Sequence, residues 1–130
     1  MQKKISTKHP NNVSRLFKAF CCSLCGFKVA FQDEAAFRQE VYVSIIAIPA
    51  ALLIGASAIE KAVLIGSLVL VLLMELINST IEAVVDKISL EIHPLSKKIK
   101  DIGSAAVTLS IFNAVIIWVI ILTSHNTVLL

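Results

Sequence analysis

Three long apolar runs limit the folds that this sequence can adopt. They cover residues 41–59, 62–74 and 102–123, and the second continues into a helix-patterned segment that ends near residue 88. A helix needs about 20 predominantly apolar residues to cross a bilayer, and 57% hydrophobic residues is too apolar a composition for a soluble domain of 130 residues. We therefore predict an all-α membrane protein with three transmembrane helices, at about 34–59, 62–88 and 97–124.

The segment before the first span divides into a polar start and an amphipathic helix. Residues 1–12 are polar and basic without apolar periodicity, so we expect them to be disordered. Residues 13–31 repeat apolar side chains at helical spacing, which predicts an amphipathic helix lying on the membrane surface. Residues 13–130 then form a single integral membrane domain. The three cysteines lack the spacing of a metal site or a disulfide framework, so we interpret them as small apolar fillers: Cys21, Cys22 and Cys25.

The distribution of Lys and Arg predicts how the spans are oriented. Segment 1–40 holds seven of these residues, segment 86–101 holds four, and the tail after residue 123 holds none. Cytoplasmic loops carry the excess of positive charge. We therefore expect the N-terminus and the second connection to be cytoplasmic and the C-terminus to lie on the opposite side of the membrane.

Capping and charged residues predict where the helices begin and end. Asp33 is expected to cap a helix that begins at Glu34, with Arg38 as the i,i+4 partner of Glu34. The charged pair at 60–61 is expected to form the short connection between the first two spans. Ser96, which follows a proline by two residues, is expected to cap the third span.

The second span carries a polar stripe, which consists of Glu75, Asn78, Glu82 and Asp86 on one helical face. An acidic residue near the centre of a membrane helix costs about 2.5–3.5 kcal/mol on insertion scales, so such a residue is a functional hypothesis by default. The alternative interpretation is a polar clamp between helices, or an end-of-helix residue that reaches the headgroups. Under either interpretation, the polar side chains of the stripe need a partner, bound water or a functional role.

A small or hydrogen-bonding face of the third span suits packing against this stripe. Small side chains let membrane helices approach closely, and the face comprises Gly103, Ala106, Ser110 and Asn113. Three helices alone are too thin a bundle to shield the polar side chains from lipid on all sides. We therefore expect a second copy of the chain to cover the side on which these polar side chains would otherwise face lipid.

The charged residues at the cytoplasmic boundary predict phosphoryl transfer at a membrane surface. Two carboxylates with room for water suit Mg²⁺, and Glu34 and Glu82 are placed for that role. Lys100 can neutralise phosphate charge, and a buried carboxylate such as Glu75 can act as general base toward a lipid hydroxyl. The sequence contains neither a Walker-type glycine-rich loop nor a kinase catalytic-loop pattern. A nucleotide site must therefore be built from helix ends and side chains.

Three sequence blocks, at 33–40, 75–86 and 100–106, resemble the signature blocks of the prokaryotic diacylglycerol kinase family. The resemblance implies a homotrimer in the bacterial cytoplasmic (inner) membrane, with three spans and one amphipathic surface helix per chain. It also implies phosphorylation of diacylglycerol by ATP and Mg²⁺ to give phosphatidic acid. In this family each active site is shared between neighbouring chains.

The resemblance also implies roles for individual residues. Glu75 would be the general base, with Asn78 in the same catalytic cluster, and Glu34 and Glu82 would hold the metal of the bound nucleotide. The nucleotide side would be completed by Asp86, Lys100 and Asp101. The lipid headgroup would be flanked by Arg15, Glu40 and Ser104. The chain departs from the family in having Asp33 where Asn is frequent, which adds either charge to the site or only a helix cap.

Two other functions fit parts of the pattern. A kinase of the same fold could act on a polyprenol such as undecaprenol, which changes the lipid and keeps the mechanism. A small non-enzymatic transporter or scaffold could use the stripe to bind cations or protons, although a proton path would not need Glu34, Lys100 and Asp101 at the cytoplasmic mouth. The expected partners are membrane lipids, ATP and further copies of the chain, with no nucleic acid.

Overall fold

The computed structural model describes residues 12–88 and 93–127, and these residues form four helices. The helices are α1 (Asn12–Asp33), α2 (Ala35–Ile54), α3 (Ala58–Ile88) and α4 (Pro94–Thr127). Three of them, α2, α3 and α4, are long and apolar enough to cross a membrane. The prediction of an all-α membrane protein with three spans and a preceding amphipathic helix is confirmed. The expected disorder of the N-terminal tail falls almost entirely outside the described residues.

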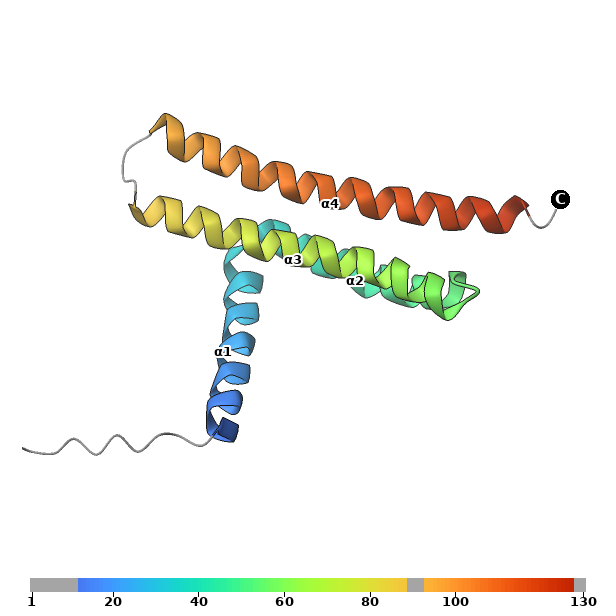
Figure 1. Cartoon of the computed structure of the whole chain (residues 1–130), viewed down its shortest axis with the longest axis horizontal. Coiled ribbons are helices and arrows are strands. Elements are labelled where there is room, and N and C mark those ends of the chain that lie inside the picture. The colour runs from blue at the N-terminus through green and yellow to red at the C-terminus, as the bar shows by residue number, and fades with distance from the viewer. Residues whose placement is uncertain (1–11, 89–92, 128–130) are drawn as a thin grey trace, which may run out of the picture.

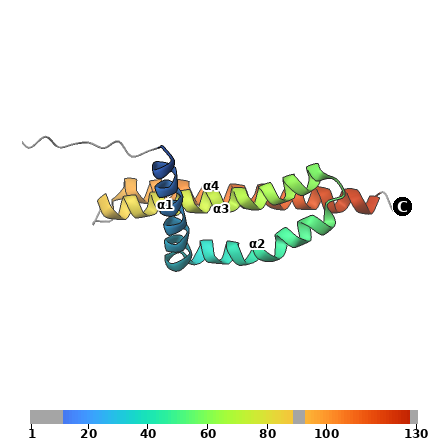
Figure 2. The same ribbon diagram turned by 90° about the horizontal axis from the view of Figure 1, so that it is seen from below.

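The three long helices run alongside one another, and α3 contacts both of the others. Figure 1 shows α3 and α4 side by side, with the C-terminal end of α4 near the turn that joins α2 to α3. Seen from below, α2 starts well away from α3 and approaches it toward that turn (Figure 2). The start of α2 therefore lies on the side where α1 joins the bundle.

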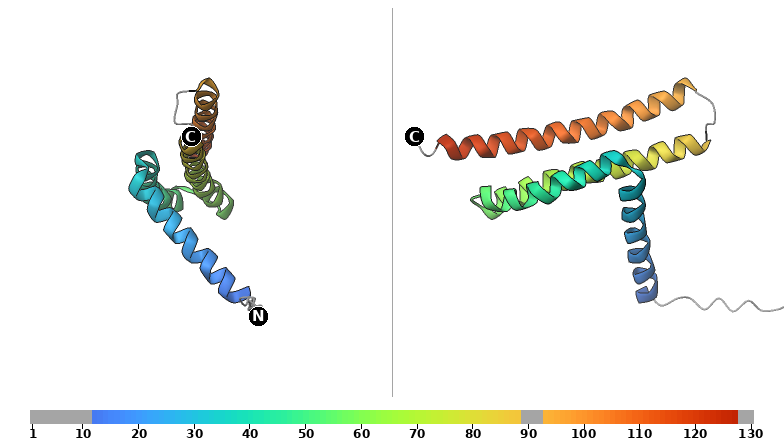
Figure 3. Two further views of the ribbon diagram at one scale, coloured as in Figure 1. Left: turned by 90° about the vertical axis from the view of Figure 1, so that its left-hand side faces the viewer. Right: turned by 180° about the vertical axis from the view of Figure 1, so that it is seen from behind.

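Helix α1 leaves the bundle crosswise, as Figures 1 and 3 show from opposite sides. If α2, α3 and α4 cross the membrane, this direction places α1 along the membrane surface. Ala30 is its one buried residue within the described part. Five of its apolar side chains, which recur at helical spacing, are 53–73% exposed, as expected of a helix that lies in the interface: Leu16, Phe17, Phe20, Leu24 and Phe27. The three cysteines of α1 are free and exposed.

The corner between α1 and α2 differs from the predicted one. Asp33 is the last residue of α1, and Glu34 is the single extended residue before α2 begins at Ala35. Asp33 therefore does not cap α2, and the N-cap residue Glu34 makes no side-chain capping bond. Arg38 does not pair with Glu34 either, because its guanidinium donates to the carbonyls of Phe31 and Gln32 at the end of α1.

The turn between α2 and α3 lies at residues 55–57, before the predicted connection at 60–61. Ser57 and Glu60 explain the difference, because together they cap the start of α3. The Glu60 backbone N–H donates to Ser57 Oγ at 3.1 Å, and Glu60 Oε2 accepts from the Ala56 N–H at 2.8 Å. Glu60 Oε2 also lies 3.0 Å from Nε2 of His125, which ties the end of α4 to this turn.

Helix α4 begins at Pro94, so Ser96 lies inside its first turn and does not cap it. The Leu95 backbone N–H instead meets Nδ1 of His93 at 3.2 Å. Proline is favoured at the first helical position because its missing N–H would have no partner there. The third span therefore starts at the proline, two residues before the predicted cap.

Small residues bring the membrane helices together. Ala51 is fully buried, and the buried Ser67 and Ser110 hydroxyls donate to carbonyls of their own helices. Such local bonds remove the cost of placing a hydroxyl in an apolar interface. Three of the four residues of the predicted packing face of α4 are buried or half-buried, whereas Asn113 is exposed.

Candidate active site

The polar stripe of α3 faces the bundle where it lies deepest and emerges toward the end of the helix. Glu75 is 6% exposed and Asn78 is 8% exposed, whereas Glu82 is half-buried and Asp86 is exposed. Because α3 rises about 1.5 Å per residue, Glu75 lies about 10 Å deeper than Glu82. The stripe thus connects a buried carboxyl group to the exposed end of α3.

Asn78 links the two glutamates of the stripe. Its Nδ2 donates to Oε1 of Glu82 at 3.1 Å, which holds that carboxylate on the site side of α3. Its Oδ1 is buried and has no hydrogen-bond partner among the described residues. Gly103 of α4 lies opposite, and a Cβ at this position would collide with Asn78 Oδ1. The close approach of α4 thus depends on a glycine.

Glu75 and three further carboxylates form an acidic cluster. Glu82 and Glu34 are close enough to act on it electrostatically, and Glu40 of α2 and Glu75 also interact. Within residues 12–88 and 93–127, none of the four forms an ion pair within 4 Å. Concentrated negative charge in a site of low dielectric is unfavourable without a cation or proton. The cluster is therefore suited to bind a cation, hold protons, or both.

Lys100 and Asp101 lie at the exposed end of this cluster. Lys100 Nζ forms an ion pair with Asp86 Oδ1 at 2.5 Å and interacts electrostatically with Glu82. Asp101 pairs with Lys97 at 2.5 Å, and both of these side chains are exposed. The structure therefore brings Lys100 to the polar stripe, whereas Asp101 points to a neighbouring cation on its own helix.

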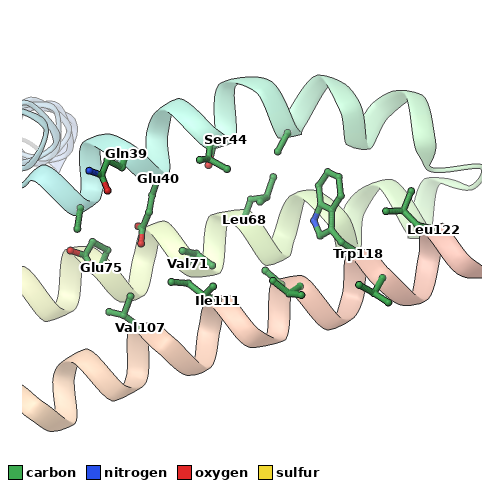
Figure 4. Close-up of a pocket in the computed structure, with 16 residues that line it drawn as sticks. Gln39, Glu40, Ser44, Leu68, Val71, Glu75, Val107, Ile111, Trp118 and Leu122 are labelled. Carbon is green, nitrogen blue, oxygen red and sulfur yellow. The ribbon is translucent and has the colours of Figure 1, made fainter.

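A cavity of about 710 Å³ lies between α2, α3 and α4, with Glu40 and Glu75 in its wall. Figure 4 shows Glu40 projecting from α2 toward α3 near Glu75, and Trp118 further along the cavity toward the α2–α3 turn. The lining between them is mainly aliphatic. A pocket of this size that combines an apolar wall with a few polar groups is typical of a small-molecule site.

Two buried polar atoms in this cavity have no hydrogen-bond partner within the part of the chain that the structure describes. They are Glu40 Oε2 and Trp118 Nε1. Sequence reasoning missed Trp118, although a tryptophan inside a span is a signal because its N–H needs a partner when buried. Glu40 was predicted to lie near the lipid headgroup, and its position in the cavity wall is compatible with that role.

The other two predicted lipid-binding residues lie elsewhere. Ser104 is exposed and does not line the cavity, although Val107 of the same helix does. Arg15 is exposed near the start of α1, about 27 Å along the helix from the corner. One chain therefore does not bring Arg15, Glu40 and Ser104 together.

The oxygen donors around Glu75 fit a hard divalent cation whose remaining ligands come from water and the substrate. No three His, Cys, Asp or Glu side chains of residues 12–88 and 93–127 converge as a metal-binding group. Mg²⁺ commonly uses one or two carboxylates together with waters and phosphate oxygens. Glu34 and Glu82 supply oxygen donors of this kind, and the unpartnered Asn78 Oδ1 is a further one.

The chain resembles characterised bacterial enzymes over most of its length. The family model "Prokaryotic diacylglycerol kinase" matches residues 21–122. The diacylglycerol kinase of Pseudomonas aeruginosa is 45% identical over 115 residues, which cover 88% of this chain and 94% of the relative. The diacylglycerol kinase of Escherichia coli K12 is 46% identical over 112 residues, and the match covers 86% and 92% of the two chains. That of Haemophilus influenzae is 44% identical over 96 residues, covering 74% and 81%. The family model matches well over half of the chain, and the chain therefore belongs to the prokaryotic diacylglycerol kinase family.

Proposed function

We propose that this protein is a diacylglycerol kinase, which transfers the γ-phosphoryl group of ATP to the free hydroxyl of diacylglycerol and yields phosphatidic acid. The observation that carries the proposal is the position of Glu75. It is a carboxyl group in the wall of an apolar cavity, next to further carboxylates that lead to the exposed end of α3. An apolar cavity suits acyl chains, and a carboxylate in its wall suits a reacting hydroxyl.

In this mechanism Glu75 acts as the general base. Its carboxylate accepts the hydroxyl proton while the lipid oxygen forms a bond to the γ-phosphorus and the bond to the leaving ADP oxygen breaks. Glu40 shares the cavity with Glu75, and its unpartnered Oε2 is available to a headgroup hydroxyl. The cavity thus orients the lipid, and the buried carboxylate removes the proton.

The nucleotide binds at the exposed end of the same cluster. Glu34 and Glu82 would hold Mg²⁺, and Asn78 keeps Glu82 oriented through its hydrogen bond. Bound Mg²⁺ supplies neutralisation of phosphate charge in phosphoryl transfer. Lys100 pairs with Asp86, interacts electrostatically with Glu82 and can turn its ammonium group toward phosphate oxygens. Asp101, the next residue of α4 after Lys100, completes the proposed set of nucleotide-binding residues.

The proposed assembly is a homotrimer in the inner membrane, with the N-terminus cytoplasmic and the C-terminus on the other side. The exposed amide of Asn113 supports an oligomer, because a polar side chain in the middle of a span is costly against lipid. The remote position of Arg15 supports a site that neighbouring chains complete. Arg15 and Ser104 would then bind the lipid headgroup at an interface between neighbouring chains.

The relatives favour diacylglycerol over a polyprenol, because the three described above are named as diacylglycerol kinases. They also disfavour a transporter or scaffold without catalysis. The decisive test is transfer of labelled γ-phosphate from MgATP in mixed micelles that contain diacylglycerol, a polyprenol or no added lipid. We expect label in phosphatidic acid. Label only in the polyprenol would change the substrate, and no label in either lipid with folded protein would refute the kinase.

A further inference from the structure

The corner between α1 and α2 consists of one residue, Glu34. Its backbone is extended, with φ −100° and ψ 111°. Its N–H donates to the Ala30 carbonyl at 2.9 Å, and its carbonyl accepts from the Arg38 N–H at 3.2 Å. Glu34 thus closes α1 and opens α2. The direction of its side chain therefore depends on how the two helices meet.

Arg38 binds the end of α1 from the first turn of α2. Its Nη1 donates to the carbonyls of Phe31 at 3.0 Å and Gln32 at 2.8 Å. The last carbonyls of a helix have no partner within the helix, and the last turn of α1 contains no basic residue. A cation at this end also complements the negative pole of the helix dipole. Arg38 therefore caps α1 with charge-assisted hydrogen bonds.

Few other contacts fix the direction of α1. The rings of Phe31 and Tyr42 meet edge to face, with centroids 5.9 Å apart and planes at 81°. Phe37 is 4% exposed and anchors the start of α2, whereas α1 itself buries only Ala30 within the described residues. Loss of the Arg38 bonds would leave α1 held by the Phe31–Tyr42 contact, the burial of Ala30 and the backbone bonds of Glu34. The angle between α1 and α2 at Glu34 would then vary more widely.

We propose that Arg38 is a positioning residue, which caps α1 and thereby fixes the direction in which Glu34 carries its carboxylate into the acidic cluster. Arg38 bonds to backbone carbonyls and acts on the reaction only through Glu34. The kinetic part of this inference rests on the proposed function, because it assigns Glu34 to the metal of the bound nucleotide. The structural part rests on the corner alone.

The kinetic test uses Arg38→Gln and measures the Mg²⁺ and lipid dependence separately. Partners that orient a metal ligand typically contribute 10–100-fold to metal affinity or activity, so we expect the Mg²⁺ concentration for half-maximal rate to rise about tenfold. The KM for diacylglycerol should change less than about twofold, because the cavity is untouched. Arg38→Lys should recover part of the loss, since an ammonium group can still reach a carbonyl. Lys18→Gln removes an exposed α1 cation about four turns from the corner and should have no effect.

The structural test measures the corner directly and does not depend on activity. One nitroxide is placed on Cys22 of α1 and the other on Leu53→Cys, an exposed position at the C-terminal end of α2. The other two cysteines are removed by Cys21→Ser and Cys25→Ser. Labelled chains are diluted into unlabelled protein, and spin–spin distances are measured by pulsed EPR. Arg38→Gln should broaden the distance distribution relative to the parent and to Lys18→Gln, and Arg38→Lys should broaden it less.

An unchanged distribution in Arg38→Gln, or Mg²⁺ and lipid constants that shift by the same factor, would overturn the inference. If Arg38→Gln does not fold, Arg38→Lys takes its place under the same two criteria. A broadened distribution in a protein whose parent transfers no phosphate would refute the proposed function and leave the capping role intact. The two failures are therefore distinguishable.

Discussion

Glu75 is a single carboxyl group on which the proposed chemistry depends. It is 6% exposed and lies among Glu34, Glu40 and Glu82, a placement that stability alone does not favour. Glu75→Gln keeps the shape and removes the base, so turnover should fall by about 10²–10⁴-fold while the fold and nucleotide affinity are retained. Glu60→Gln makes the same change at the other end of α3, outside the site, and serves as the matched control. Near-normal phosphate transfer by Glu75→Gln would remove this residue from the base role.

Gly103 gives a second prediction at the residue scale. A Cβ at this position would collide with Asn78 Oδ1, whereas a Cβ at Gly66 of α3 would meet nothing within 4 Å. Gly103→Ala should therefore displace the Asn78 side chain, lower turnover and cost about 1–3 kcal/mol of stability. Gly66→Ala should be neutral or stabilise the helix by up to about 1 kcal/mol. Turnover and unfolding in mixed detergent would be compared, and equal effects of the two variants would contradict the proposed contact.

Residue-scale prediction succeeded where spacing along one helix decides the outcome. The intervals of three residues from Glu75 to Asn78 and four residues from Asn78 to Glu82 are sufficient to place these side chains on one face. The structure buries Glu75 and Asn78. Trp118 and Arg38 were not recognised in their present surroundings. Their partners and neighbours come from other helices or from across a corner, and no interval within one helix reports such contacts.

At the scale of helices, the ends of the elements depend on local caps. Ser57 accepts the Glu60 N–H and fixes the start of α3. Ser57→Ala should lower the free energy of unfolding by about 1 kcal/mol, as the loss of a serine cap typically does. Ser96→Ala is the matched control, because Ser96 lies inside the first turn of α4 and should change stability by less than about 0.5 kcal/mol. Titration with a denaturing detergent would measure both, and equal losses would contradict the assignment of the cap.

The existence of the spans was predictable, but their ends were predicted less well. Hydropathy alone identifies an apolar run of sufficient length, and all three spans were confirmed. The charges at Glu60 and Lys61 suggested a connection, yet both residues lie in the first turn of α3 because Glu60 serves as a capping partner. The pattern Ser57 to Glu60 is a capping box and could have located this end. The start of α4 was misplaced in a similar way, because Ser96 was predicted as the cap although Pro94 already occupies the first helical position.

At the scale of the whole molecule, one chain contains most of the proposed catalytic cluster. Glu34, Glu75 and Glu82 interact electrostatically within one chain, and Lys100 joins them through Asp86 and Glu82. Arg15 is the exception, because α1 carries it away from the bundle (Figure 1). In the proposed homotrimer a neighbour would contribute the start of α1, whereas Glu34 and Glu82 act on Glu75 within one chain.

Mixed oligomers test this division. When Glu34→Gln and Glu75→Gln chains are mixed, every chain has one defect within its own cluster, so we expect no recovery of activity.

When Arg15→Gln and Glu75→Gln chains are mixed in equal amounts, a site with an intact Glu75 can take Arg15 from a neighbour of the other kind. Random assembly in a cyclic oligomer then completes about one quarter of the sites, which sets the expected activity relative to the parent. Phosphate transfer would be measured after co-refolding, with each variant alone as the control. Recovery in the Glu34 and Glu75 mixture would show that the carboxylates come from different chains, and no recovery in the Arg15 mixture would place Arg15 outside the shared site.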